Sequence, residues 1–320
     1  LRALMRELAF RRAVRRMGEP FYLVCGYGDS GSMAVRGLSK VGRRSVVIDI
    51  DEKRHQILAL EDLQQPVPGL CADAGCPDSL LTAGLQSRYG VGILALTDDD
   101  NANLQITLTA RLLRPDLPVI ARAETPQAVD NLRAVGANHI LNPFDLFTRV
   151  LRHAIHAPSL YMLDELLTSA PHEALCARVA PPRGHWILSG YGRFGQAVHR
   201  ALRGEGITCT VIEEDPRLQQ LVPGALLGRG TDAGLLERAG IRQATVLVAG
   251  TDNDTTNLSM VLIARQLNPD VFVVARQNHG ENTPNFVAAR IPLVLQRGRV
   301  LAGEVFSIVT APLIVEWLEW

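Results

Sequence analysis

The stretch Phe21-Tyr-Leu-Val-Cys-Gly-Tyr-Gly-Asp-Ser-Gly31 is an apolar run that ends in a Gly-x-Gly-x-x-Gly turn and leads into a helical pattern. The stretch Ile187-Leu-Ser-Gly-Tyr-Gly-Arg-Phe-Gly195 repeats this order later in the chain. In such a turn the first glycine permits the tight bend, the second lets backbone approach a pyrophosphate, and the third lets the helix pack against its strand. Free N–H groups at the helix start then face an anion. Both stretches therefore predict a strand, a nucleotide-binding turn and a helix.

An acidic residue ends the second apolar run of each copy. Ser45-Val-Val-Ile-Asp49 and Cys209-Thr-Val-Ile-Glu213 both place this acid 18 residues after the third glycine. A carboxylate at that strand end accepts hydrogen bonds from ribose hydroxyls and repels a 2′-phosphate. The pattern favours NAD or an adenosine nucleotide over NADP, and a Rossmann-like fold with a vestigial pocket is the alternative.

Composition narrows the class of protein. A length of 320 residues predicts about two domains of ordinary size. The 33 basic and 33 acidic residues balance, which argues against nucleic acid as the main partner. Five scattered cysteines without a Cys-x-x-Cys pair fit a reducing compartment better than a disulfide framework. No apolar run reaches the length of a membrane span, so we expect nothing in this chain to cross a membrane.

Short β-branched runs alternate with helical periods along both halves of the chain. We expect strands near residues 21–25, 45–49, 67–71, 92–96, 118–122 and 138–141, and again near 186–189, 208–212, 224–228, 245–249, 271–275 and 292–295. In the first half, helices are expected near 30–41, 53–62, 77–86, 100–114 and 125–135. This alternation predicts an α/β protein with parallel sheets and right-handed crossovers.

The two halves also match outside the glycine turns. Leu96-Thr-Asp-Asp-Asp100 aligns with Gly250-Thr-Asp-Asn-Asp254, and Ala121-Arg122 aligns with Ala275-Arg276, all at an offset of 154 residues. Matches in a common register indicate a duplication. The fold class is therefore two tandem doubly wound, Rossmann-like domains with connecting crossover helices. We expect a basic linker helix over 1–19, the first domain over 20–142, crossover helices and a linker over 143–182, the second domain over 183–297 and a last crossover helix over 298–320.

Together these motifs resemble the RCK domain family, regulators of potassium conductance, also called the TrkA-N or KTN type. The resemblance covers about 21–158 and 185–320, and it rests on the Gly-Tyr-Gly turns, the Val-Ile-Asp and Val-Ile-Glu strand ends, Ala72-Asp-Ala74, the Thr-Asp-x-Asp runs and Ala121-Arg-Ala123. It implies a non-catalytic gating module of a prokaryotic ligand-gated potassium channel, at the cytoplasmic face of the cell membrane. The implied ligand is NAD(H) or an adenine nucleotide (AMP, ADP or ATP).

The basic leader Arg11–Met17 resembles the segment that joins a pore helix to the first such domain. Because the chain starts at Leu1 without a methionine, we expect further residues upstream. The resemblance then implies a potassium pore domain on the same full-length chain, and a homotetramer that carries eight RCK domains.

Matching the family motifs residue by residue gives the candidate binding residues. In the first copy they are Gly26, Gly28, Asp29, Ser30, Gly31, Asp49, Asp73, Ala74, Thr97, Asp98 and Arg122. In the second copy they are Gly190, Gly192, Arg193, Phe194, Gly195, Glu213, Thr251, Asp252 and Arg276.

The copies differ where a phosphate would lie. Asp29 follows the second glycine of the first copy and would repel a phosphate, whereas the second copy has Arg193 there. Asp73 aligns with Arg229. We therefore expect the second copy to take the more anionic ligand.

Two acidic runs, Asp98–Asp100 and Glu213–Asp215, could supply the oxygen ligands that Ca²⁺ takes. A ribose carboxylate and helix N-caps are the favoured interpretation, so Ca²⁺ is possible but not favoured and no metal ligand is assigned. Two other function classes stay open: a soluble TrkA-like regulatory subunit of a potassium uptake system, and an NAD-dependent oxidoreductase. The second is disfavoured because both domains are of the nucleotide type, which leaves no substrate domain with a proton donor.

The crossover segments Phe144–Leu167 and Val300–Trp320 carry more apolar residues than one small domain can cover. Exposed apolar area of that extent marks an interface. We expect the two domains to pack through these segments, and chains to associate further.

Overall fold

The computed structural model describes residues 2–157, 159 and 180–311. They form two six-stranded parallel sheets in two compact units. Of the described residues, the first unit holds 2–143 and 301–311, and the second holds 144–157, 159 and 180–300. Tyr161, Leu163 and Leu313, three of the apolar residues in the crossover segments Phe144–Leu167 and Val300–Trp320, lie outside the described residues.

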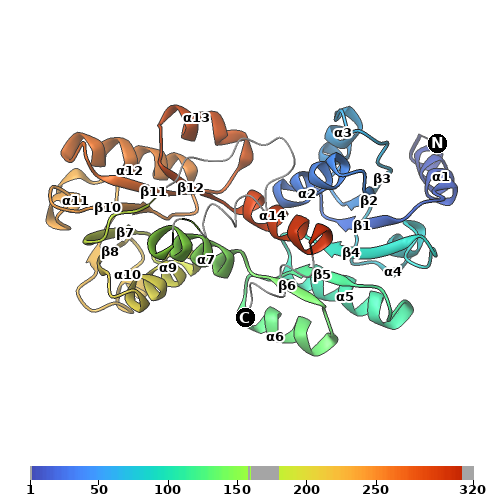
Figure 1. The fold of residues 1–320 in the computed structure, drawn as a ribbon, viewed down its shortest axis with the longest axis horizontal. Coiled ribbons are helices and arrows are strands. Elements are labelled where there is room, and N and C mark those ends of the chain that lie inside the picture. The colour runs from blue at the N-terminus through green and yellow to red at the C-terminus, as the bar shows by residue number, and fades with distance from the viewer. Residues whose placement is uncertain (1, 158, 160–179, 312–320) are drawn as a thin grey trace. The chain divides into compact units, whose positions relative to one another are not determined.

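The first unit is a doubly wound sheet (Figure 1). Its strands are β1 (Phe21–Cys25), β2 (Arg44–Asp49), β3 (Gly69–Cys71), β4 (Gly90–Ala95), β5 (Val119–Arg122) and β6 (His139–Leu141), in the order β3-β2-β1-β4-β5-β6. Its helices are α1 (Arg2–Arg16), α2 (Asp29–Lys40), α3 (Glu52–Leu60), α4 (Pro77–Thr82), α5 (Asp100–Leu113) and α6 (Pro126–Val135). The strand order reverses between β1 and β4, and ligands of such sheets bind beyond the strand ends at this switch point.

The second unit repeats this topology, in the order β12-β11-β10-β7-β8-β9. Its strands are β7 (His185–Ser189), β8 (Thr208–Glu213), β9 (Leu226–Leu227), β10 (Val246–Ala249), β11 (Phe272–Gln277) and β12 (Leu293–Gln296). The helices of this half of the chain are α7 (Pro143–His156), α9 (Arg193–Gly204), α10 (Pro216–Gln219), α11 (Ala233–Arg238), α12 (Asp254–Leu267), η1 (Gly280–Asn282), α13 (Thr283–Ala288) and α14 (Arg297–Thr310). The predicted fold class is confirmed in both units.

Strand register confirms one predicted alignment between the copies. Asp49 pairs with Cys71 across β2 and β3, and Glu213 pairs with Leu227 across β8 and β9. Asp73 lies two residues after Cys71, and Arg229 lies two residues after Leu227. The loop after the third strand therefore carries an acid in the first unit and Arg229 in the second.

Helix α1 is part of the first core. Phe10, Val14 and Met17 are buried in one apolar cluster with Leu23 and residues of α4, α5 and α6. Its arginines from position 6 onward are exposed. The basic leader is thus an amphipathic helix held on the domain by its apolar face. Within the described residues, no helix is both long enough and apolar enough to cross a bilayer.

The helices that follow each sheet become parts of the other unit. Phe147 of α7 is fully buried and packs edge-to-face on Phe194 of α9, with ring centroids 5.5 Å apart. Residues of α14 from Leu301 onward belong to the first unit, where a Cβ added to Gly37 of α2 would lie 3.4 Å from the Phe306 ring. The apolar faces expected on these crossover helices are therefore covered, as far as they are described, inside the two units.

Candidate functional site

Both glycine turns have the geometry that the motif requires. Gly26 and Gly190 have φ angles of 95° and 92°, in the left-handed region that favours glycine. A Cβ on Gly31 would lie 1.9 Å from the carbonyl oxygen of Gly26, and one on Gly195 would lie 2.0 Å from that of Gly190. The third glycine of each turn therefore lets the following helix pack directly on the turn.

The acid at the end of the second strand fixes each turn. The buried carboxylate of Asp49 accepts hydrogen bonds from the N–H groups of Tyr27 and Asp51, the latter at 2.8 Å. Glu213, also buried, accepts the two equivalent backbone hydrogen bonds in the second unit. These bonds orient a carboxylate beside the glycine turn, where it can accept further hydrogen bonds from a ribose.

A buried asparagine joins two strand ends in each unit. The Asn103 side chain accepts from the N–H of Thr97 at 3.1 Å and from its Oγ1 at 2.8 Å. It donates to the carbonyls of Thr97 and Arg122 at 3.0 and 2.9 Å. Asn257 makes the same four bonds to Thr251 and to the carbonyl of the equivalent arginine. This clamp holds the ends of β4 and β5, or β10 and β11, at the mouth of the site.

We expect Asn257→Ala to lower the free energy of unfolding of the second unit by about 2 to 3 kcal/mol, because each buried polar group left without a partner costs about 1 kcal/mol or more. Chemical denaturation measures this change. Asn285→Ala, at an exposed position of α13, is the control and should change stability by less than about 0.5 kcal/mol. Equal losses from the two substitutions would contradict the role given to this clamp.

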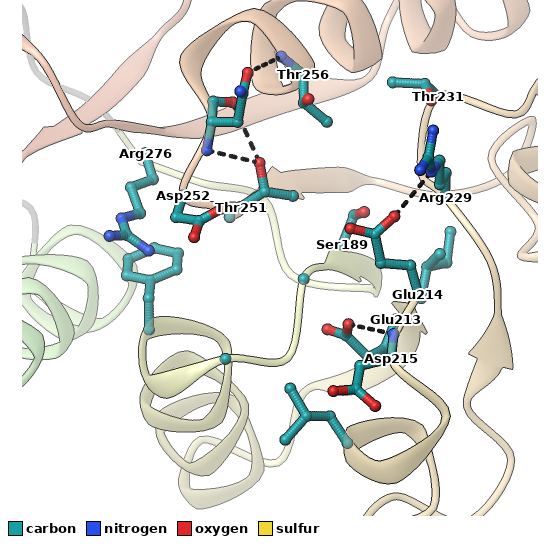
Figure 2. A pocket seen from close by; sticks show the side chains of 18 of the residues that line it. Ser189, Glu213, Glu214, Asp215, Arg229, Thr231, Thr251, Asp252, Thr256 and Arg276 are labelled. Carbon is teal, nitrogen blue, oxygen red and sulfur yellow. Dashed lines mark hydrogen bonds and ion pairs between the residues drawn. The ribbon is translucent and has the colours of Figure 1, made fainter.

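A cavity of about 650 Å³ opens at the switch point of the second sheet (Figure 2). Of the predicted residues, Gly190, Gly192, Arg193, Phe194, Glu213, Thr251, Asp252 and Arg276 line it. The remaining one, Gly195, is buried where α9 meets the turn. Lining residues outside the predicted binding set are Phe144, Ser189, Ile212, Glu214, Asp215, Leu218, Gly228, Arg229, Gly230, Thr231, Gly250, Asn253 and Thr256. Eight of the nine predicted residues of the second copy therefore line this cavity, together with residues that no family motif marks.

Three arginines from different elements reach this cavity. Arg276 lies over the Phe194 ring at 5.5 Å, and Arg193 lies over the Phe144 ring at 5.3 Å. Arg229 pairs with Glu214 at 2.8 Å on the rim opposite Arg276 (Figure 2). That pair is largely exposed, and exposed ion pairs contribute little, so Arg229 can turn to a phosphate at small cost. The lining also holds four carboxylates, those of Glu213, Glu214, Asp215 and Asp252, so the cavity offers cations to a phosphate and acceptors to ribose hydroxyls.

The arginine of the first unit that is equivalent to Arg276 pairs with two carboxylates. Arg122 is 2% exposed and pairs with Asp98 and Glu124. Burial alone lowers the pKa of Arg122, but the two neighbouring carboxylates outweigh it and raise the pKa overall. In the second unit the position of Glu124 is taken by Asn278, whose amide donates to Asp254. One carboxylate near the arginine is therefore replaced by a neutral side chain.

A second arginine of the first unit, Arg54 of α3, was not predicted. Its guanidinium lies 3.5 Å from Asp49, 4.0 Å from Asp51 and 3.9 Å from Asp98. A Cβ on Gly28 would lie only 3.3 Å from its Nη1. No motif marks this residue, because a single arginine in the first turn of a helix is common on protein surfaces.

Other predicted residues of the first unit have local roles. Asp73 accepts a hydrogen bond from the N–H of Gly75 at 2.8 Å, which forms a turn after β3. Ala74 is buried in the core cluster. Asp29 and Ser30 are the first two residues of α2, and Ser30 is buried. The structure thus brings the glycines, Asp49, Asp98 and Arg122 together at the carboxyl ends of the strands. The side chain of Asp73 instead bonds within its own turn.

Structural contacts account for the acidic runs. Asp99 caps α5 by accepting from the N–H of Asn101 at 2.8 Å, and Asp215 caps α10 by accepting from that of Arg217 at 2.9 Å. Asp100 accepts from the backbone of Glu124 and Thr125 and holds the loop after β5. The N-cap interpretation is confirmed for Asp99 and Asp215. No cluster of three potential metal ligands occurs in the part of the chain that the structure describes.

The family profile described as "TrkA-N domain" matches the chain twice, over residues 22–143 and 186–296. Each match spans the sheet and the glycine turn of one unit.

Relatives that match in sequence include proteins of potassium transport. "Potassium channel protein 1" of Methanocaldococcus jannaschii is 32% identical over 126 residues, which is 38% of this chain and 36% of that protein. The "Glutathione-regulated potassium-efflux system protein KefC" of Escherichia coli is 31% identical over 122 residues, which is 37% of this chain and 20% of that protein. The matched region therefore spans about a third or less of these relatives.

Solved structures match over almost the whole chain. GsuK bound to ADP superposes with a TM-score of 0.68 at 22% identity, over 92% of this chain and 70% of that one. GsuK bound to NAD superposes with a TM-score of 0.69 at 17% identity, over 94% of this chain and 66% of that one. At this identity the likeness establishes the fold: two Rossmann-like units in tandem.

Proposed function

The chain belongs to the TrkA-N domain family, with two such domains in tandem, and from that premise we propose that it is the ligand-sensing regulatory module of a potassium-transport protein. Its sequence relatives include a potassium channel protein and a potassium-efflux protein. In this proposal the second unit binds NAD(H) or an adenine nucleotide, and binding changes the activity of a potassium pore at the cytoplasmic face of the membrane.

The observation that carries this proposal is the cavity of the second unit. Its volume of about 650 Å³ lies within the range of about 300 to 1,000 Å³ of small-molecule sites. The glycine turn and the start of α9 offer backbone N–H groups to a pyrophosphate. Glu213 is placed for ribose hydroxyls, and Arg193, Arg229 and Arg276 provide positive charge. Among the fold relatives, GsuK has been seen with ADP and with NAD, which supports this ligand class.

Calorimetric titration with NAD⁺, NADH, AMP, ADP and ATP tests the proposal, and we expect at least one of them to bind. Glu213→Gln should weaken that ligand about tenfold to a hundredfold, since hydrogen bonds to a charged group are worth about 1.5 to 3 kcal/mol. Asp232→Asn, which changes an exposed N-cap of α11, is a control of equal charge change. No heat from any nucleotide would favour the vestigial pocket. Substrate-dependent oxidation of NADH by the chain would favour the oxidoreductase.

Regulation requires more than binding. A ligand shifts an equilibrium between two states only as far as its affinities for the two states differ. We therefore propose that the nucleotide stabilises one arrangement of associated chains, a tetramer with eight such domains on a pore of the same polypeptide. Light scattering of the 320-residue chain, with and without the bound nucleotide, measures this association. A monomer under both conditions would favour the soluble, TrkA-like subunit arrangement in which partners supply the assembly.

A further inference from the structure

The glycine turn of the first unit is covered by a side chain of the protein itself. The Arg54 guanidinium lies so close to Gly28 that a Cβ there would approach its Nη1, Cζ and Nη2 to 3.3, 3.4 and 3.5 Å. The equivalent Gly192 has no atom within 4 Å of such a Cβ. The second glycine of the motif is the place where a pyrophosphate approaches the backbone. Arg54 therefore occupies in the first unit the space that is open in the second.

The same guanidinium engages the carboxylate that a ribose would need. Its Nη1 lies 3.5 Å from Oδ2 of Asp49, a side chain that is only 4% exposed. Its Nη2 lies 3.9 Å from Asp98, which also pairs with Arg122. In the second unit Glu213 has only its two backbone donors as partners among the described residues.

One sequence difference accounts for this contrast. Asp51 caps α3, and Arg54 is the third residue of that helix. Asp215 caps α10 in the same way, and the third residue there is Leu218, which lines the open cavity. The two helices begin at the same place relative to the ribose acid, so a charged side chain in one unit replaces an apolar side chain in the other.

We propose that Arg54 fills the nucleotide position of the first unit and so determines which unit binds the ligand. The chain then binds one nucleotide, in the second unit. This inference rests on the proposed function of the second unit. A phosphate that paired with Arg54 would share its guanidinium with Asp49 and Asp98. Asp49 and Asp98, with Asp29 at the start of α2, would then lie close to the phosphate, and like charges repel each other.

Reciprocal exchange of the two residues tests the inference in the 320-residue chain. We expect the wild type to bind one equivalent of ADP or NADH by calorimetry, and Arg54→Leu to bind two. Leu218→Arg should weaken the site of the second unit about tenfold or more, which corresponds to about 1.4 kcal/mol for displacing an arginine from Glu213. The double variant R54L/L218R should bind one equivalent again, now sensitive to Asp49→Asn.

Arg133→Leu removes an exposed arginine from α6 of the same unit and controls for net charge. It should leave the wild-type stoichiometry unchanged, and thermal denaturation should show each variant folded.

An Arg54→Leu chain that gains no site contradicts the inference whatever the wild type binds. A wild type that binds two equivalents and loses one in Arg54→Leu contradicts it as well, because Arg54 would then be a phosphate ligand. A wild type that binds none contradicts the proposed function, and a site gained in Arg54→Leu would still support this inference.

Discussion

Replacing Gly195 by alanine is expected to destabilise the second unit by about 3 kcal/mol or more and to remove measurable nucleotide binding. The added Cβ would lie 2.0 Å from the carbonyl oxygen of Gly190, and the contact is with backbone, which has no other rotamer to adopt. The start of α9 must then move away from the turn. Because the N–H groups of that helix start form the anion site, the same displacement that costs stability also dismantles the site.

Two other glycines of α9 and its cap separate these effects. Gly192→Ala meets no atom within 4 Å and has no positive φ, so it should fold as well as the wild type. Its methyl group would nevertheless stand where the pyrophosphate approaches, so we expect weaker binding. Gly204→Ala, at the far end of α9, also meets no atom and should change neither binding nor stability by more than about 1 kcal/mol. Chemical denaturation and calorimetry on all three variants measure these changes. Equal stability of Gly195→Ala and Gly192→Ala would contradict the close contact with Gly190.

The fold could be predicted because its signals are local in the sequence. Each buried strand is a short apolar run, and each turn of the switch point carries glycines whose spacing matches a single backbone geometry. The acids Asp49 and Glu213 end their strands, so their position beside the turn follows from the strand direction alone. Even the alignment of Asp73 with Arg229 was predicted from the sequence, and the strand register of the structure agrees with it.

The missed features depend on contacts between segments that are distant in sequence. Arg54 reaches Gly28 and Asp98 across the sheet edge, and its effect appears only when three loops come together. The positions of α7 and α14, each of which follows one sheet in the sequence and belongs largely to the other unit, are a similar case. Their apolar faces predicted an interface, but periodicity does not say which sheet a helix packs on. Phe144 consequently lines the cavity of the second unit although it follows the first sheet.

Replacing Arg122 by methionine is expected to lower the free energy of unfolding of the first unit by about 3 to 5 kcal/mol, the cost of breaking a buried ion pair on one side. Methionine retains much of the side-chain volume, so the loss reports charge more than packing. Without Arg122, the Glu124 carboxylate, 11% exposed, loses the guanidinium that pairs with it, and Asp98 loses a partner that lies closer than Arg54 at 3.9 Å. Chemical denaturation at neutral pH measures the loss.

The second unit supplies the matched comparison for this substitution. Arg276→Met removes a less buried arginine that has Asn278, an uncharged side chain, where the first unit has Glu124. We expect it to cost stability about 1 kcal/mol, the size of a cation–π contact with Phe194, and to weaken an anionic ligand of the cavity. Adding Glu124→Gln to Arg122→Met should restore part of the lost stability, because the buried carboxylate then carries no charge. Equal losses of stability from Arg122→Met and Arg276→Met would contradict this role of the acids. Packing alone would then stabilise the end of β5.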